Sequence, residues 1–353
     1  MIAVNARFLT QSITGVQRYA FEMSKALRKF CNEDEIVFFA PRNIRLKNEA
    51  DELNVKIVGS HTGHLWEQLD LPRHLKKIGS PLLLNFCNTA PIFYKNKFST
   101  MHDITYVRYP GTYSRLFRLY YRVMMPLVLR TSRHIFTVSE FSRKEISEYF
   151  HFPIENISVA YNAVSSEFKP VVDEKLNAEK YLLAVSSVKE NKNFLMALRA
   201  FKSVSVNLPQ VKLFIVGDLK AGNFSSVDLS EFMNDSNIRF LGRVSDSQLI
   251  KLYSNAVAFL FPSLYEGFGI PVLEAQACGC PVIASNTASL PEVLKNSAIM
   301  KNPYDVRELS DAITHIAENV EFRHQVVNLG YENIKRFSWE KSAMNIMNIA
   351  AGG

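Results

Sequence analysis

The chain has 353 residues, of which 47% are hydrophobic and 21% charged, a composition typical of a soluble globular protein with two domains. No apolar run approaches the roughly 20 residues of a membrane span, and residues 1–11 show a strand pattern with an early Arg7 rather than a signal peptide. The four cysteines fit a reducing compartment, and no second Cys/His pair accompanies Cys278 and Cys280 to complete a zinc site, so we expect a cytoplasmic protein.

The net charge of +7 is unevenly distributed. Residues 1–165 carry 22 Lys/Arg and 14 Asp/Glu, a charge of +8, whereas residues 166–353 carry 19 and 20, a charge of −1. This asymmetry predicts that the two halves meet different partners. No motif that reads nucleic-acid bases accompanies the basic residues, so nucleic acid is not an expected partner.

The first half alternates short strand patterns with helical ones. Residues 1–8 alternate apolar and polar side chains as a strand does, and Val16–Phe30 places its apolar residues on one face of a helix. Gly15 lies in the turn between them, where a phosphate can approach the backbone; a plain turn glycine is the alternative. Further elements are expected as strands at Ile36–Ala40, Val55–Val58, Leu82–Phe86, Arg133–Val138 and Ile157–Tyr161, and as helices at Leu65–Lys77 and from the cap residue Ser139 to Tyr149.

Residues Phe98–Val107 are predicted to form a strand that delivers His102 and Asp103 at its carboxyl end. In open α/β sheets ligands bind beyond these ends, which makes His102 a candidate site residue. A lone histidine is more commonly structural, so both readings stay open at this point.

Residues Tyr113–Arg133 are predicted to form a helix with a basic and aromatic face, kinked or divided at Pro126. From Arg108 to Lys144 the chain has eight Lys/Arg and a single acid, Glu140. The interleaved aromatic residues are Tyr109, Tyr113, Phe117, Tyr120 and Tyr121. A solvated basic face is the alternative to a binding surface.

The second half follows an expected linker at Asn162–Pro170 and again alternates strands with helices. This alternation argues for parallel sheets covered by helices on both faces. The expected strands are Tyr181–Val185, Val211–Val216, Ile238–Leu241, Ala256–Phe261 and Pro281–Ala284. The expected helices are Asn193–Asn207, a helix capped by Ser245 and Gln248, Ile270–Ala277, one near Pro291 and three within Asp305–Ala350.

The most informative stretch, Phe261–Glu292, joins a buried strand to a helix through Glu266-Gly267-Phe268-Gly269. The glycines allow a sharp turn and a close ligand approach, and the N–H groups at the start of the helix favour an anion. Glu266 and Glu274 would repel phosphate, so we expect them to accept hydrogen bonds from hydroxyls. Together these groups suit a sugar nucleotide, although an ordinary turn with solvated glutamates would contain the same residues.

The spacing of Glu266 and Glu274 resembles the E-x7-E signature of retaining glycosyltransferases of family 4, which have the GT-B fold. The resemblance extends over Ala277–Ser285, Leu290–Glu292 and Gly242–Ser245, and more weakly over nearly the whole chain. It implies an α/β protein with two Rossmann-like, doubly wound parallel-sheet domains facing across a cleft. The N-terminal acceptor-binding domain would comprise 1–165 plus a crossing helix at about 338–353, and the C-terminal donor-binding domain 166–337.

The resemblance also implies roles for individual residues. Lys192 would neutralise the donor diphosphate, Glu266 would bind the donor sugar and Glu274 the ribose. His102 would lie beside the transferred sugar, and Gly15 would face the diphosphate. Backbone groups of Gly267, Phe268, Gly269 and Ile270 would hold the sugar and diphosphate, and Arg243 and Val244 would line the base.

One departure from the family pattern stands near Ser187, where many members carry an arginine. Ser186 replaces a glycine of the pattern, while Lys192-Asn193 is kept. The missing arginine puts a two-cation clamp in doubt, and Asn191 and Arg243 are the candidate substitutes for it. No Asp-x-Asp metal motif is evident, so we expect no metal and no other cofactor.

The resemblance is closest to bacterial mannosyl- and rhamnosyl-type transferases of polysaccharide assembly, with GDP-mannose as the first expected donor. The acceptor would be a lipid-linked oligosaccharide. The Arg108–Lys144 region would dock the enzyme on anionic lipid at the inner face of the cytoplasmic membrane. Two alternatives remain open, namely another GT-B enzyme such as a sugar-nucleotide epimerase, and a non-catalytic nucleotide-sugar-binding subunit.

Overall fold

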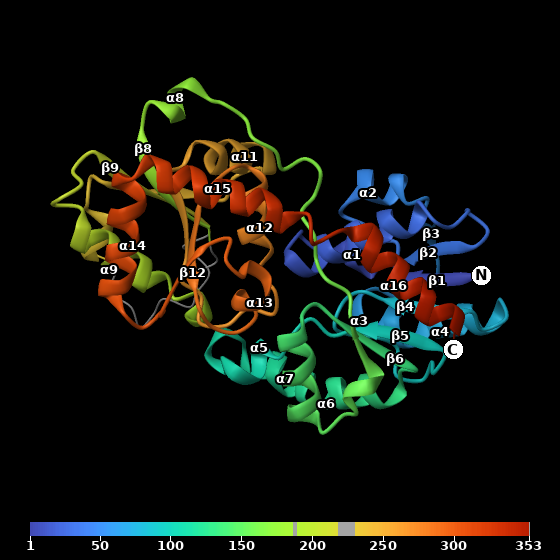
Figure 1. Cartoon of the computed structure of the whole chain (residues 1–353). Helices are drawn as coiled ribbons and strands as arrows, with labels where there is room; N and C mark the ends of the chain where they lie inside the picture. The colour runs from blue at the N-terminus through green and yellow to red at the C-terminus, as the bar shows by residue number, and fades with distance from the viewer. Residues whose placement is uncertain (186–188, 218–229, 353) are drawn as a thin grey trace. The chain divides into compact units, whose positions relative to one another are not determined.

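The computed structural model describes residues 1–185, 189–217 and 230–352, which form two compact units (Figure 1). Each unit is built around one parallel sheet, as the alternation of strand and helix patterns predicts. The first unit comprises Met1–Ile104, Ser114–Asn162 and Ser338–Gly353, and the second comprises Thr105–Tyr113 and Ala163–Phe337.

The sheet of the first unit has seven parallel strands in the order β3-β2-β1-β4-β5-β6-β7. The central neighbours β1 and β4 are short apolar runs whose residues are almost all buried, as in a sheet covered on both faces. The strands are β1 (Ile2–Asn5), β2 (Ile36–Ala40), β3 (Lys56–Ile57), β4 (Leu82–Asn85), β5 (Lys97–Thr100), β6 (His134–Thr137) and β7 (Ile157–Val159).

The helices of the first unit agree with most of the predicted ranges, including the Ser139 cap, whose hydroxyl accepts the Ser142 N–H at 3.0 Å. The helical elements are η1 (Arg7–Thr10), α1 (Gly15–Arg28), α2 (Lys47–Glu52), α3 (Gly63–Leu65), the π-helical turn η2 (Trp66–Asp70), α4 (Leu71–Lys77), α6 (Arg115–Thr131), α7 (Glu140–Phe150), η4 (Ile154–Asn156) and α16 (Trp339–Gly352).

The last helix, α16, packs against α1 of the first unit, and Figure 1 shows the two helices side by side. The Ser342 hydroxyl donates to the Tyr161 carbonyl at 2.8 Å, and the Asn345 amide donates to the Val159 carbonyl at 3.0 Å. These contacts join the two ends of the chain in one unit.

The sheet of the second unit has six parallel strands in the order β10-β9-β8-β11-β12-β13. Its core is aliphatic and aromatic, and α9 and α14 pack against each other and contribute residues to it. The strands are β8 (Lys180–Val185), β9 (Val211–Val216), β10 (Ile238–Gly242), β11 (Ala258–Phe261), β12 (Val282–Ser285) and the unpredicted β13 (Ile299–Lys301).

The helices of the second unit include the predicted capping box, in which Ser245 and Gln248 each accept the other's backbone N–H. The helical elements are α5 (Thr105–Arg108), η3 (Pro110–Thr112), α8 (Glu174–Asn177), η5 (Glu190–Lys192), α9 (Phe194–Val204), α10 (Ser230–Met233), α11 (Asp246–Asn255), α12 (Ile270–Ala277), α13 (Leu290–Leu294), α14 (Val306–Glu318) and α15 (Val320–Ile334).

The predicted strand Phe98–Val107 is wrong beyond Thr100. Strand β5 ends there, and the chain continues into the short helix α5. Residues 105–113 belong to the second unit, where the rings of Tyr109 and Tyr265 lie 5.9 Å apart and Lys189 lies over the ring of Tyr113. A local apolar pattern cannot distinguish these tertiary contacts from a continuing strand.

The expected division of the helix at Pro126 is also wrong, because α6 is one helix from Arg115 to Thr131. Proline removes the N–H that would bond the carbonyl four residues earlier, that of Arg122. Arg122 is exposed, so water can hydrate this carbonyl and the helix continues. Across the described residues, no helix has both the length and the apolar content needed to cross a bilayer.

Candidate functional site

The candidate site of the second unit lies where the strand order of its sheet reverses. The chain builds outward from β8 through β9 to β10 on one side and from β11 to β13 on the other. Ligands of open parallel sheets bind at such a switch point, beyond the carboxyl ends of the strands. Here β8 leads toward η5 with Lys192, and β11 leads into the loop that contains Glu266.

Lys192 and Glu266 form a partly buried ion pair. The Lys192 Nζ donates to both carboxylate oxygens of Glu266, at 2.7 and 2.8 Å. The two side chains are only 22% and 10% exposed, and the ammonium also lies 5.8 Å from the centre of the Phe261 ring. Because the pair is shielded from water, each charge depends on the other for its compensation.

Backbone and side-chain hydrogen bonds hold the Glu266 loop in place. The Leu264 N–H donates to the Asn191 carbonyl at 2.8 Å, and the Asn191 amide donates to the Tyr265 carbonyl at 3.0 Å. From the other side, the Ser289 hydroxyl donates to the Glu266 carbonyl at 2.9 Å. Asn191 is buried and links η5 to the loop. Its side-chain amide is used in this contact and does not replace the missing arginine of the family pattern.

Gly269 sets the start of α12. Its φ of +92° lies in the left-handed region, and a Cβ there would come within 3.0 Å of Leu290 Cδ2 and 3.4 Å of Phe261 Cε1. The helix begins at Ile270, as predicted, and Pro271 lies in its first turn. The first N–H groups of the helix have no acceptor within it, so this end of α12 favours negative charge.

Glu274 lies one turn further along α12 and is 6% exposed. Glu266 is 8% exposed as a whole residue, so the loop and the helix each place one carboxylate in a buried position. A buried carboxylate needs hydrogen-bond donors. The solvated-glutamate alternative is therefore wrong for both residues.

Arg243 and Val244 lie elsewhere on the same sheet. They follow β10, an edge strand that is separated from β8 by β9. Arg243 is exposed, and Gly242 before it takes a φ of +68° that turns the chain out of the strand. Ser186 and Ser187, near which the arginine of the family pattern is absent, lie outside the described residues.

His102 and Gly15 belong to the first unit. The His102 Nε2 lies 2.8 Å from the Phe86 carbonyl, and since a carbonyl only accepts, Nε2 carries the proton. Burial lowers the pKa of His102, although the Phe86 hydrogen bond and the Asp103 charge oppose this shift, so the ring is neutral at neutral pH. Gly15 opens α1 and is exposed, with no atom within 4 Å of the position of an added Cβ.

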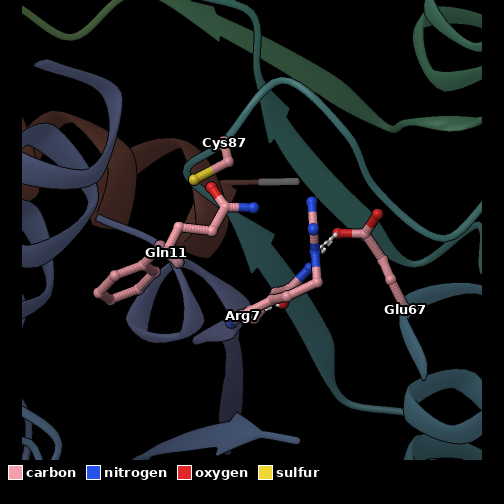
Figure 2. Close-up of a pocket in the computed structure, with 6 residues that line it drawn as sticks. Arg7, Gln11, Glu67 and Cys87 are labelled. Atoms are coloured by element: carbon pink, nitrogen blue, oxygen red, sulfur yellow. Dashed lines mark hydrogen bonds and ion pairs between the residues drawn. The ribbon is translucent and has the colours of Figure 1, made fainter. Parts of the chain in front are cut away.

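A second buried ion pair, which was not predicted from the sequence, joins Arg7 to Glu67 in the first unit (Figure 2). The Arg7 Nε donates to Glu67 Oε1 at 3.1 Å, and the two side chains are 9% and 1% exposed. Arg7 lies two residues after the end of β1, and a charged residue near the end of the first predicted strand could have indicated the site. Glu67 gave no such signal, because it lies within a helical pattern 60 residues away.

Two families match the chain in sequence. Residues 166–333 match Glycosyl transferases group 1, and residues 13–168 match Glycosyltransferase Family 4. The O-antigen chain mannosyltransferase B of Escherichia coli is 30% identical over 261 residues, which cover 71% of this chain and 68% of that protein. The O-antigen chain mannosyltransferase RfbU of Salmonella typhimurium is 28% identical over 354 residues, which cover 94% and 97%.

Solved structures show the same fold. Anabaena Alr3699/HepE, in complex with UDP and glucose, superposes with a TM-score of 0.77 at 17% identity and 99% coverage of both chains. WaaG, a glycosyltransferase involved in lipopolysaccharide biosynthesis, superposes with a TM-score of 0.72 at 16% identity and complete coverage of both chains. The predicted GT-B fold, with two Rossmann-like parallel-sheet units, is thereby confirmed.

The Lys192–Glu266 pair should couple strongly in folding. We expect Lys192→Met and Glu266→Gln each to lower the free energy of unfolding, because each leaves a shielded charge without its partner. The double variant should lose less than the sum, with a coupling energy of about 1–3 kcal/mol measured by urea unfolding. The exposed pair Lys335–Glu332 is the control and should show no measurable coupling. Additive losses at Lys192 and Glu266 would contradict the pairing.

Gly269 should not tolerate a side chain. Gly269→Ala should lower the free energy of unfolding by about 1–3 kcal/mol, since it combines left-handed backbone strain with contacts to Leu290 and Phe261. Gly15→Ala is the matched control, because that position has open space and an ordinary φ, and it should leave stability almost unchanged. Equal unfolding midpoints for the two variants would show that the turn at Gly269 is not constrained.

Proposed function

The chain belongs to glycosyltransferase family 4, in its mannosyltransferase-like group, and we propose that it transfers a hexose from a nucleotide diphosphate sugar to a sugar acceptor in bacterial polysaccharide assembly. The observation that carries the proposal is the Lys192–Glu266 pair beside the start of α12 at the switch point of the second sheet. The names of the relatives support mannose, and thus GDP-mannose, as the first donor to test.

The geometry of the pair suits a donor that is anionic at one end and hydroxylated at the other. An ammonium has three N–H groups, and two of those on Lys192 go to Glu266, so one remains for an oxygen of the diphosphate. The Glu266 carboxylate has about four acceptor positions, two of which are filled by Lys192, so sugar hydroxyls can use the others. In this proposal one ion pair binds both parts of the donor, while Glu274 accepts from the ribose.

The proposed reaction breaks the bond between the anomeric carbon and the β-phosphate oxygen, and the electron pair leaves with the phosphate. The acceptor oxygen attacks the anomeric carbon from the same face, which retains its configuration, and its proton passes to the departing phosphate. Lys192 and the first N–H groups of α12 would stabilise the growing negative charge. We propose that these groups serve in place of a metal ion, with Arg243 and Val244 beside the base and Gly15 and His102 contributed by the first unit.

We also propose that α6 docks the enzyme on an anionic membrane surface, and the outer face of this helix supports the proposal. Four aliphatic residues at helical spacing are exposed there, namely Leu116 (77%), Leu119 (62%), Val123 (55%) and Leu127 (36%). Arg115, Arg122 and Arg130 are exposed around them, and α6 contains no acidic residue. An aliphatic stripe flanked by arginines is the composition of a helix that lies in the interface of an anionic bilayer. A lipid-linked acceptor on the inner face of the cytoplasmic membrane would be within reach of an enzyme docked in this way.

The inner face of α6 is held firmly, so the exposed stripe is not the result of loose packing. Lys97 is fully buried, and its Nζ donates to the carbonyl and the hydroxyl of Thr131, the last residue of α6, at 2.9 and 2.8 Å. Burial lowers the pKa of Lys97 to about 7. Within α6 the ring of Phe117 stacks on that of Tyr121, and the Tyr120 hydroxyl lies within hydrogen-bond distance of His64 Nδ1.

Activity should depend on Glu274. The purified protein would be incubated with radiolabelled GDP-mannose, or with UDP-glucose, and extracted bacterial glycolipids. Glu274→Ala should lower kcat/KM for the donor about 10- to 100-fold, since it removes charged hydrogen bonds worth roughly 1.5–3 kcal/mol. The exposed Glu318→Ala is the control and should leave the kinetics unchanged. A folded Glu274 variant with wild-type kinetics would remove this residue from the site.

The same assay distinguishes the rival functions. We expect the labelled sugar to appear in the glycolipid with the anomeric configuration that it had in the donor. We expect the same result in the presence of EDTA. A changed free nucleotide sugar would indicate an epimerase, and binding without turnover would indicate a non-catalytic subunit. Loss of transfer on metal removal would contradict the metal-free mechanism.

Liposome flotation tests the membrane proposal. Binding should require anionic lipid and weaken as salt rises. Changing Arg115, Arg122 and Arg130 together to Ser should weaken it roughly 100-fold, at about 1 kcal/mol for each cation near the surface. The matched control changes three exposed cations of the second unit, Lys175, Arg199 and Arg307, to Ser, and should bind as wild type does. Equal binding to neutral and anionic liposomes, or to neither, would refute docking through α6.

A further inference from the structure

Residues 105–113 come from the first half of the sequence but pack in the second unit, against the segments that carry Lys192 and Glu266. They include the short helices α5 and η3, and they are followed directly by Ser114, the cap residue of α6. A segment so far from the donor loop in sequence and so close to it in the fold can act on the ion pair of the candidate site.

The 105–113 segment is fixed by its own hydrogen bonds. The Tyr109 carbonyl accepts from the Thr112 hydroxyl at 2.8 Å and from the Thr112 N–H at 3.2 Å. The Tyr109 N–H donates to the Thr105 carbonyl at 2.8 Å. Thr105 and Thr112 are both buried, which shields these bonds from water. The side chain of Tyr109 is therefore presented by a backbone with a defined conformation.

Tyr109 contacts the loop that carries Glu266. Its ring lies 5.9 Å from the ring of Tyr265, and the two planes are inclined at 51°. Aromatic rings at this separation attract each other. Tyr265 immediately precedes Glu266 and is only 5% exposed, so its ring is confined by the surrounding side chains. The contact thus restrains the residue next to the Glu266 carboxylate.

Tyr109 is also linked to the segment that carries Lys192. Its hydroxyl forms a hydrogen bond with Tyr304. Burial and the neighbouring Tyr304 raise the pKa of Tyr109 to about 12, so the hydroxyl keeps its proton at neutral pH. The loop of Tyr304 is held in turn by Asn193, the residue after Lys192, whose amide donates to the Pro303 carbonyl at 2.8 Å.

Two further contacts join the 105–113 segment to η5. The Lys189 ammonium lies 5.0 Å from the centre of the Tyr113 ring, within the range of a cation–π interaction. Gly111 lies close to Glu190, because a Cβ on this glycine would come within 3.0 Å of Glu190 Oε2. Lys189 caps η5, Glu190 is its first residue and Lys192 is its last. The segment therefore contacts the turn that ends in the site lysine.

We propose that Tyr109 is a positioning residue for the Lys192–Glu266 pair. Its ring restrains the loop through Tyr265, and its hydroxyl restrains the Lys192 segment through Tyr304. One side chain thus acts on both halves of the pair. The effect on the donor rests on the proposed glycosyltransferase function, since a pair held in one geometry is preorganised for the diphosphate and the sugar.

The first arm of the test examines the ion pair without any ligand. Urea unfolding gives the coupling between Lys192→Met and Glu266→Gln, first in wild type and then in Tyr109→Ala. The coupling should fall to about half or less, because the two charges are no longer held at one distance. A merely structural role would lower stability and leave the coupling unchanged. Tyr149→Ala, at an exposed tyrosine of the first unit, is the matched control and should keep the full coupling.

The second arm measures steady-state transfer from radiolabelled GDP-mannose, or from UDP-glucose, to a glycolipid acceptor. Tyr109→Ala loses a ring contact and a hydrogen bond, so it should lower kcat/KM for the donor about 10-fold. The acceptor KM should change less than about twofold. Tyr109→Phe keeps the ring and should recover most of the loss, to within about 2- to 3-fold of wild type. If Tyr109→Ala does not fold, Tyr109→Leu, which fills much of the space of the ring, replaces it in both arms.

The two arms separate the positioning role from the proposed function. Unchanged coupling in Tyr109→Ala would overturn the inference, and so would equal donor kinetics for Tyr109→Ala and Tyr149→Ala in a protein that transfers sugar. If the coupling falls but no sugar is transferred, the proposed function fails while the positioning role stands. If transfer occurs and Tyr109→Ala behaves as wild type in both arms, the positioning role fails alone.

Discussion

The ion pair between Lys192 and Glu266 is the interaction on which the candidate site depends. It joins the segment after β8 to the loop after β11 at the point where the sheet reverses its order. Both charges are shielded, so neither can be lost without leaving the other uncompensated. The Asn191 and Ser289 contacts then fix the backbone of the same loop, and Gly269 provides the turn into α12. The position of the helix start, and therefore of any anion bound there, follows from this set of contacts.

Each unit has a buried cation–carboxylate pair at its switch point, but the two cations differ in the hydrogen-bond donors that remain beyond the pair. Arg7 has a planar, forked guanidinium that donates to both Glu67 and Thr89, so it orients the carboxylate. Lys192 has a compact ammonium with one N–H beyond those used by Glu266.

Helix α6 carries part of the basic charge of the first half. Its inner face is packed against the unit and its outer face is exposed. Lys97 is buried, and within the described part of the chain its ammonium donates to the Tyr94 carbonyl and to Thr131 at the end of α6 rather than to a carboxylate. The residues of α6 that are buried are Met124, Met125, Val128 and Leu129, whereas Leu116, Leu119, Val123 and Leu127 are exposed. A helix fixed in this way presents its outer face without rearrangement.

The sequence by itself determined the elements of regular structure and the chemistry of the Glu266 stretch. Apolar periodicity located the strands apart from β13 and most of the longer helices, and caps such as Ser139 and Ser245 located helix starts, because these patterns act within a few residues. The glycine turn before Ile270 was predictable for the same reason. Only the tertiary structure decided that Lys192 binds Glu266, that Glu67 meets Arg7, and that residues 105–113 join the second unit. These partners are distant along the chain, and which charge a side chain meets depends on how the strands are ordered in the sheet, which no local pattern encodes.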